Sequence, residues 1–104
     1  MKILAPDDHT LAVSGLQELV AANAAQVRDE IRAALKPTTT QLDLDLSGVT
    51  FLDSGGLGTL ISLQKSLRAR NGTVRLLNPS PNARQLLELT RLHSVFDILS
   101  QQRP

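Results

Sequence analysis

Leucine alternates with polar residues between positions 42 and 46: Leu42, Leu44 and Leu46 are separated by Asp43 and Asp45. A period of two places successive side chains on opposite faces of a strand, so this pattern predicts a strand with one buried face. Asp43 and Asp45 then share the other face, where we expect both to be solvated. Their spacing gives no reason to expect a catalytic pair of carboxylates.

Apolar residues at helical spacing predict three helices. The first begins near Ala24 after Asn23, its expected N-cap, and the third follows Asn82, which we expect to cap that helix. The second lies between Gly56 and the Asn71–Gly72 pair. The three apolar faces consist of Ala24, Val27, Ile31, Ala34 and Leu35; of Leu57, Leu60, Ile61, Leu63 and Leu67; and of Ala83, Leu86, Leu87 and Leu89.

Two further strands are predicted, at Thr10–Val13 with Ile3–Leu4 beside it, and at Thr73–Leu77. Because strands and helices alternate, we expect an α/β fold: a small mixed sheet of about four to five strands packed with three to four α-helices, joined by right-handed crossovers. A last apolar cluster lies between residues 92 and 98. The residues expected in the core are Leu44, Leu46, Leu57, Leu60, Ile61, Val74, Leu76 and Leu86.

Length and composition indicate one ordinary globular domain over residues 1–104, with a frayed tail from about residue 100. The chain has no cysteine, which excludes disulfides, cysteine-ligated zinc and thiol chemistry, and favours the cytoplasm. Its net charge of +1 and its two aromatic residues argue against direct nucleic-acid binding. It contains no signal peptide and no run of 18 apolar residues, so we expect no membrane insertion.

Metal and hydrolytic sites are not indicated. His9 and His93 lie far apart, and neither has a second ligand at metal-binding spacing. A triad of Ser54, His93 and Asp53 is disfavoured because adjacent Asp53 and Ser54 leave no room for a histidine between them. We therefore expect no catalytic residues, no metal and no cofactor.

The sequence Asp53-Ser54-Gly55-Gly56 stands at a predicted turn from strand to helix. The first N–H groups of a helix have no intrahelical partners and favour anions, so a phosphate on Ser54 would be stabilised there. The glycines would also leave the backbone open to another protein. The alternative is structural, with Asp53 or Ser54 capping the helix and the glycines permitting a tight turn. No Gly-Lys-Ser/Thr follows, which excludes a Walker-type phosphate loop.

Residues 44–60 read Leu-Asp-Leu-Ser-Gly-Val-Thr-Phe-Leu-Asp-Ser-Gly-Gly-Leu-Gly-Thr-Leu. This segment resembles the signature of STAS domains, especially of bacterial anti-sigma factor antagonists, whose core reads Asp-Ser-Ser/Ala/Gly-Gly-Leu-Gly. The resemblance extends more weakly from Leu11 to Ile98. It implies a single STAS domain.

In that family the serine after the aspartate is phosphorylated by an anti-sigma serine/threonine kinase, and a PP2C-type serine phosphatase reverses the modification. Carried over by position, this residue is Ser54. The resemblance implies a phosphoprotein that regulates transcription by partner switching and is not an enzyme. Its unphosphorylated form would bind the kinase and release the sigma factor, and phosphorylation would break the complex.

The resemblance places the partner contacts on the motif and on the loop after Gly15. This loop lacks the family's acidic residue after the leucine, since Val20 follows Leu19, and Gly55 stands where many antagonists have a second serine. Two other roles of STAS domains stay open: a subunit of a phospholipid-transport ABC complex, or an adaptor in a sensory assembly or for small apolar ligands. The expected partner-binding residues are Asp53, Ser54, Gly55, Gly56, Leu57, Glu18 and Asn23.

Overall fold

The computed structural model describes residues 1–100. The expected frayed tail falls almost entirely on residues 101–104, which lie outside the described residues. In chain order the elements are β1 (Lys2–Asp7), β2 (Thr10–Ser14), β3 (Glu18–Leu19), α1 (Ala21–Ala34), β4 (Gln41–Asp45), β5 (Phe51–Leu52), α2 (Ser54–Arg68), β6 (Thr73–Leu77), α3 (Pro81–Leu89), the 3-10 helix η1 (Leu92–Ser94) and β7 (Asp97–Leu99).

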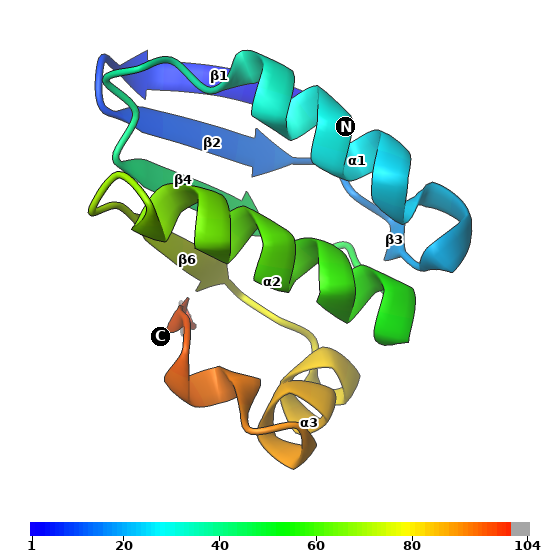
Figure 1. Cartoon of the computed structure of the whole chain (residues 1–104). Helices are drawn as coiled ribbons and strands as arrows, with labels where there is room; N and C mark the ends of the chain where they lie inside the picture. Colours follow the sequence, from blue (N-terminus) through cyan, green and yellow to red (C-terminus); the bar gives the residue numbers. More distant parts are fainter. Residues whose placement is uncertain (101–104) are drawn as a thin grey trace, which may run out of the picture.

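Five strands form one mixed sheet in the order β1-β2-β4-β6-β7. Strand β1 runs antiparallel to β2, and the other neighbours are parallel. Helices α1 and α2 lie side by side over one face (Figure 1), and the buried hydroxyl of Thr59 in α2 donates a hydrogen bond of 3.0 Å to the carbonyl of Ala24 in α1. The predicted α/β class, with four to five strands and three to four helices, is confirmed.

The strands are amphipathic across the sheet. The residues that face α1 and α2 are buried, namely Leu11, Val13, Leu42, Leu44, Val74 and Leu76. Six of the eight residues predicted for the core are buried, and Ile61 and Leu86 are half-buried because they lie at the margins of their helices' apolar faces. Within residues 1–100 no helix combines the length and apolar character that a membrane span requires.

Asp43 is buried, so the prediction that it is solvated is wrong. Only 9% of the residue is exposed, because the parallel register of β4 and β6 sets Arg75 directly opposite. The Nε and Nη2 atoms of Arg75 donate hydrogen bonds of 2.8 and 3.0 Å to the two carboxylate oxygens. These bonds raise the pKa of Arg75. Asp45, on the same face, is half-buried.

Neither predicted asparagine N-cap is correct. Helix α1 begins earlier, after Val20, and Asn23 lies within its first turn, where its Oδ1 accepts the N–H of Val20 at 2.8 Å. Helix α3 begins after Ser80, whose Oγ accepts the N–H of Ala83 at 3.2 Å. Pro81 takes the first helical position, where its missing N–H has no consequence.

Candidate functional site

The sequence Asp53-Ser54-Gly55-Gly56 forms the turn from β5 into α2 and the start of that helix. Asp53 is the N-cap of α2 and Ser54 is its first residue, with an exposed side chain. Within residues 1–100 the Ser54 hydroxyl makes no hydrogen bond. The side chain is therefore available to a second protein at a helix end that favours negative charge.

The carboxylate of Asp53 joins the N-termini of two helices. Its Oδ1 accepts the N–H of Gly56 in α2 at 3.0 Å, and its Oδ2 accepts the N–H of Ala21 in α1 at 3.1 Å. The bond from Gly56, followed by that from Ala21, lowers the pKa of Asp53. Asp53 thus stays ionised under ordinary conditions and fixes the position of Ser54 against α1.

The two glycines after Ser54 are required by close backbone approach. A Cβ atom at Gly56 would lie 1.9 Å from the carbonyl oxygen of Leu19, and one at Gly55 would lie 2.5 Å from Cα of Ala21. Any side chain there would push β3 or the start of α1 away from α2. The glycines therefore hold the loop around Glu18 and the N-terminus of α1 against the motif.

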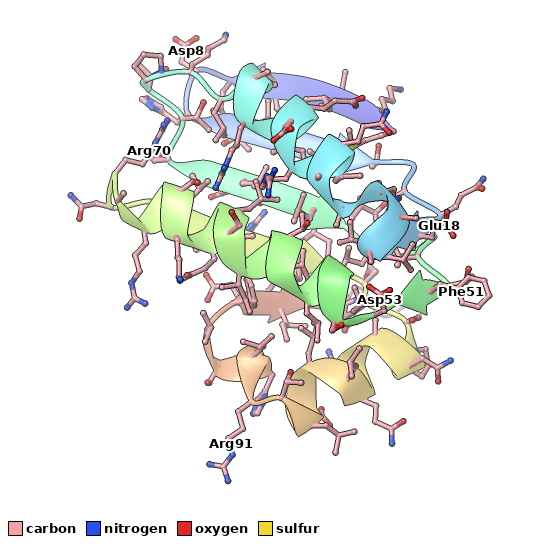
Figure 2. The ribbon with its side chains drawn as sticks, turned by 45° about the vertical axis from the view of Figure 1, so that its right-hand side comes forward. Asp8, Glu18, Phe51, Asp53, Arg70 and Arg91 are labelled. Carbon is pink, nitrogen blue, oxygen red and sulfur yellow. The ribbon has the colours of Figure 1, made fainter. Side chains whose placement is uncertain are left out.

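A two-stranded parallel ribbon of β3 and β5 flanks the turn. Glu18 pairs with Phe51, and Leu19 pairs with Leu52. The leucine pair faces inward, whereas Glu18 and Phe51 project outward at the end of the molecule that carries Asp53 (Figure 2). Phe51 is not among the site residues expected from the sequence. A signal was present, because adjacent strand residues point to opposite faces and so Phe51 and Leu52 cannot both face inward.

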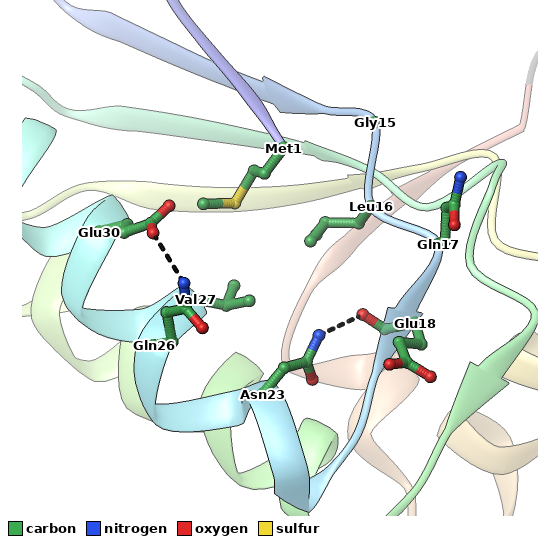
Figure 3. A pocket seen from close by; sticks show the side chains of 9 residues that line it. All are labelled: Met1, Gly15, Leu16, Gln17, Glu18, Asn23, Gln26, Val27 and Glu30. Atoms are coloured by element: carbon green, nitrogen blue, oxygen red, sulfur yellow. Dashed lines mark hydrogen bonds between the residues drawn. The ribbon is translucent and has the colours of Figure 1, made fainter.

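Glu18 and Asn23 line a pocket of about 430 Å³ between β3 and α1, with an apolar floor that includes Leu16 and Val27 (Figure 3). The Nδ2 of Asn23 donates a hydrogen bond of 2.9 Å to the carbonyl of Glu18. Since its Oδ1 accepts the N–H of Val20, Asn23 is tied to the β3 loop through both ends of its amide.

The expected partner-binding residues are brought to one end of the molecule but are not equally accessible. Glu18, Asp53 and Ser54 are exposed, and Gly55 and Asn23 are half-buried. Gly56 and Leu57 are buried, Leu57 within the core. Gly56 and Leu57 therefore pack under the turn, and only the exposed and half-buried residues of the set can contact a partner.

The helix N-terminus favours negative charge, and Arg70 and Arg91 lie away from Asp53 (Figure 2). Residues 1–100 contain no group of three or more His, Cys, Asp or Glu side chains suited to a metal ion.

The fold and the Asp53–Ser54 turn define the class of this protein. The sequence profile of the STAS domain family matches residues 5–102, nearly the whole chain. The chain belongs to the STAS domain family.

Its relatives include regulators of sigma factors. An anti-sigma F factor antagonist from Lysinibacillus sphaericus is 37% identical over 68 residues, which cover 64% of this chain and 58%, less than two thirds, of that protein. An anti-sigma-B factor antagonist from Listeria monocytogenes is 31% identical over 81 residues, covering 78% of this chain and 71% of that protein.

The fold resembles that of the antagonist SpoIIAA from Bacillus. Its unphosphorylated form matches with a TM-score of 0.82 and its phosphorylated form with 0.77, each at 23% identity. Both matches cover 98% of this chain, and they cover 88% and 91% of the two SpoIIAA chains. At this identity the likeness concerns the fold.

Proposed function

We propose that this chain is an anti-sigma factor antagonist that works by partner switching and is controlled by phosphorylation of Ser54. In its unphosphorylated form it binds an anti-sigma serine/threonine kinase, and the kinase then releases its sigma factor. The observation that carries the proposal is the exposed hydroxyl of Ser54 at the N-terminus of α2. Ser54 lies in a STAS domain that has relatives named anti-sigma factor antagonists.

The covalent step is a phosphoryl transfer from ATP bound to the kinase. The Ser54 oxygen forms a bond to the γ-phosphorus, the bond between that phosphorus and the bridging oxygen breaks, ADP leaves, and the hydroxyl proton passes to a base. A PP2C-type phosphatase reverses the change by adding water, which restores the hydroxyl and yields inorganic phosphate. In this scheme the chain is a cytoplasmic substrate and regulator, and the enzymes are its partners.

Charge explains how the phosphate breaks the complex. A phosphoserine carries about −1.5 to −2 charges at pH 7, and here it would stand beside the ionised Asp53. In a protein interface this charge brings repulsion and a desolvation penalty. In the free domain the N-terminus of α2 stabilises the phosphate, so the switch requires no change of fold.

The contact surface in this proposal consists of exposed and half-buried residues at the end of the molecule where α2 begins. Asp53, Ser54 and Gly55 supply its centre, and Glu18 with Asn23 supplies its edge on the β3 loop. Gly56 and Leu57 act indirectly, since they shape the turn from beneath.

Affinity capture from native cells tests the proposal, with wild type, Ser54→Ala and Ser54→Glu as baits and mass spectrometry of the partners and the Ser54 peptide. We expect wild type and Ser54→Ala to recover an ATP-binding anti-sigma kinase, Ser54→Glu to lose it, and native Ser54 to carry phosphate. Asn71→Asp is a matched control, because it adds one negative charge beyond the far end of α2. Recovery of ABC-transporter subunits by all baits, with Ser54 unmodified, would contradict the proposal and favour the lipid-transport role.

A further inference from the structure

Phe51 is a large apolar side chain that the fold does not bury. The chain has only two aromatic residues, and the other, Phe96, is 5% exposed, whereas Phe51 is 66% exposed. The pairing of β5 with β3 turns Leu52 inward and Phe51 outward beside Glu18 (Figure 2). A ring held largely in water contributes little to the stability of the core and is free to contact a partner.

The same residue forms one wall of a pocket of about 260 Å³. Val49, Thr50 and Leu52 line it on the β5 side, and Ser80, Asn82 and Ala83 at the start of α3 line it on the other, so the lining is part apolar and part polar. The α3 wall is held in place by the hydrogen bond from the Ala83 N–H to the Ser80 hydroxyl. The pocket therefore exists before any partner arrives, and it lies only three residues in sequence from Ser54.

The charges around Phe51 favour a basic partner. Glu18 lies opposite Phe51 in the ribbon, and Asp53 follows two residues later; both are exposed. Among residues 1–100 the ion pairs are Arg28–Asp29 and Asp43–Arg75, so neither Glu18 nor Asp53 belongs to one. Both oxygens of Asp53 accept backbone N–H groups, whereas the carboxylate of Glu18 projects from the ribbon. An apolar ring paired with the exposed Glu18, and two residues before Asp53, is complementary to a surface that combines an apolar side chain with positive charge.

We propose that Phe51 is an anchor that determines recognition of the anti-sigma kinase. An apolar side chain of the kinase enters the pocket beside Phe51 and covers its ring, while basic residues of the kinase lie opposite Glu18 and Asp53. This inference rests on the proposed function and extends it. The anchor supplies affinity, because aromatic residues buried at the centre of an interface carry much of the binding free energy, and Ser54 supplies the switch.

The test measures the dissociation constant of the purified kinase, identified by the capture experiment, for purified variants of the full chain by titration calorimetry. We expect Phe51→Ala to weaken binding about 30-fold and Phe51→Leu to weaken it less, because leucine restores part of the apolar contact. Leu89→Ala is the matched control: Leu89 is 74% exposed at the end of α3, and its loss should change affinity by less than about twofold.

Phosphorylation kinetics give a second readout. If Phe51 acts only in binding, Phe51→Ala should raise the KM of the kinase for this chain and leave kcat unchanged. Melting temperatures of all variants are compared first, and we expect Phe51→Ala to melt like wild type because its side chain is exposed.

The outcomes separate the two proposals. If Ser54→Glu loses the kinase but Phe51→Ala binds as tightly as wild type, the anchor is overturned and the proposed function stands. If wild type binds no kinase, the proposed function fails and the anchor fails with it. The same holds if wild type and Ser54→Glu bind the kinase with equal affinity. If Phe51→Ala abolishes self-association in sedimentation experiments and leaves kinase affinity unchanged, the ring belongs to a contact between two copies, which also overturns the anchor.

Discussion

The carboxylate oxygen Oδ2 of Asp53 lies 3.1 Å from the backbone nitrogen of Ala21, a residue 32 positions earlier in the chain. Through the other oxygen, the same carboxylate caps α2 at Gly56. One side chain thereby sets the distance between the N-termini of α1 and α2. Ser54 is the first residue of α2 and follows Asp53 directly, so the geometry of the proposed switch depends on Asp53.

Loss of the Asp53 charge should destabilise the protein in a pH-dependent way. Its pKa is lowered in the folded state, so its ionised form contributes stability that is fully present above the unfolded value of about 3.9 and is lost as the pH falls through the folded-state pKa. The difference in unfolding free energy between wild type and Asp53→Asn should be greater at pH 7 than below about pH 4. Urea unfolding followed by circular dichroism measures it, and a pH-independent difference would refute the assignment.

Gly56 and Gly58 provide a matched pair on one helix. A Cβ at Gly56 would overlap the carbonyl of Leu19, whereas a Cβ at Gly58 meets no atom within 4 Å. Gly56→Ala should therefore destabilise the protein by about 3 kcal/mol or more. Gly58→Ala should stabilise it by about 0.5 to 1 kcal/mol, because alanine favours the helix. Equal effects of the two substitutions in thermal or urea unfolding would contradict the close approach of β3 to α2 at Gly56.

The core depends on leucines that face the helices. Leu76 is fully buried in β6, and Leu76→Ala should reduce the free energy of unfolding by about 2 to 5 kcal/mol. The exposed Leu89 is the control, since its replacement by alanine should change stability by less than about 0.5 kcal/mol. Urea denaturation of both variants decides the matter, and a tolerated Leu76→Ala would contradict the layer arrangement.

The pair of Asp43 and Arg75 should contribute more than an ordinary surface ion pair. Asp43→Asn keeps the size of the side chain but removes its charge, and we expect a loss of about 1 to 2 kcal/mol, below the value for a fully buried pair because Arg75 reaches solvent. Asp29→Asn removes the charge from the exposed pair with Arg28 and should cost less than about 0.5 kcal/mol. Similar losses in denaturant unfolding would mean that burial of Asp43 has no energetic consequence.

Periodicity predicted the elements that are long enough to show it. The alternation at residues 42–46 and the apolar run at 73–77 correctly gave β4 and β6, because each face of these strands has a distinct environment. Strands β3 and β5 have two residues each, too few to show a period, and β7 has three. This is why the outward position of Phe51 became visible only in the structure.

Local sequence patterns could not predict the contacts between residues that are distant in the chain. The sequence marked Asp43 as polar, but only the register of β4 and β6 brings Arg75 opposite it, 32 residues later. Likewise Asp53 was recognised as a possible cap, and its second bond to Ala21 depends on how α1 packs. Asn23 lies in the first turn of α1, where it accepts the N–H of the N-cap residue Val20, whereas an N-cap asparagine would accept an N–H of the first turn. The residue type alone does not separate these two positions.

The central claim is that phosphate on Ser54 controls binding of the anti-sigma kinase. The most direct measurement is the dissociation constant of the purified kinase for this chain before and after stoichiometric phosphorylation of Ser54, with Ser54→Ala incubated in parallel with kinase and ATP as the control. We predict that phosphorylation weakens binding by about 30-fold or more while Ser54→Ala stays bound. Equal affinity of the phosphorylated and unphosphorylated forms would contradict the account.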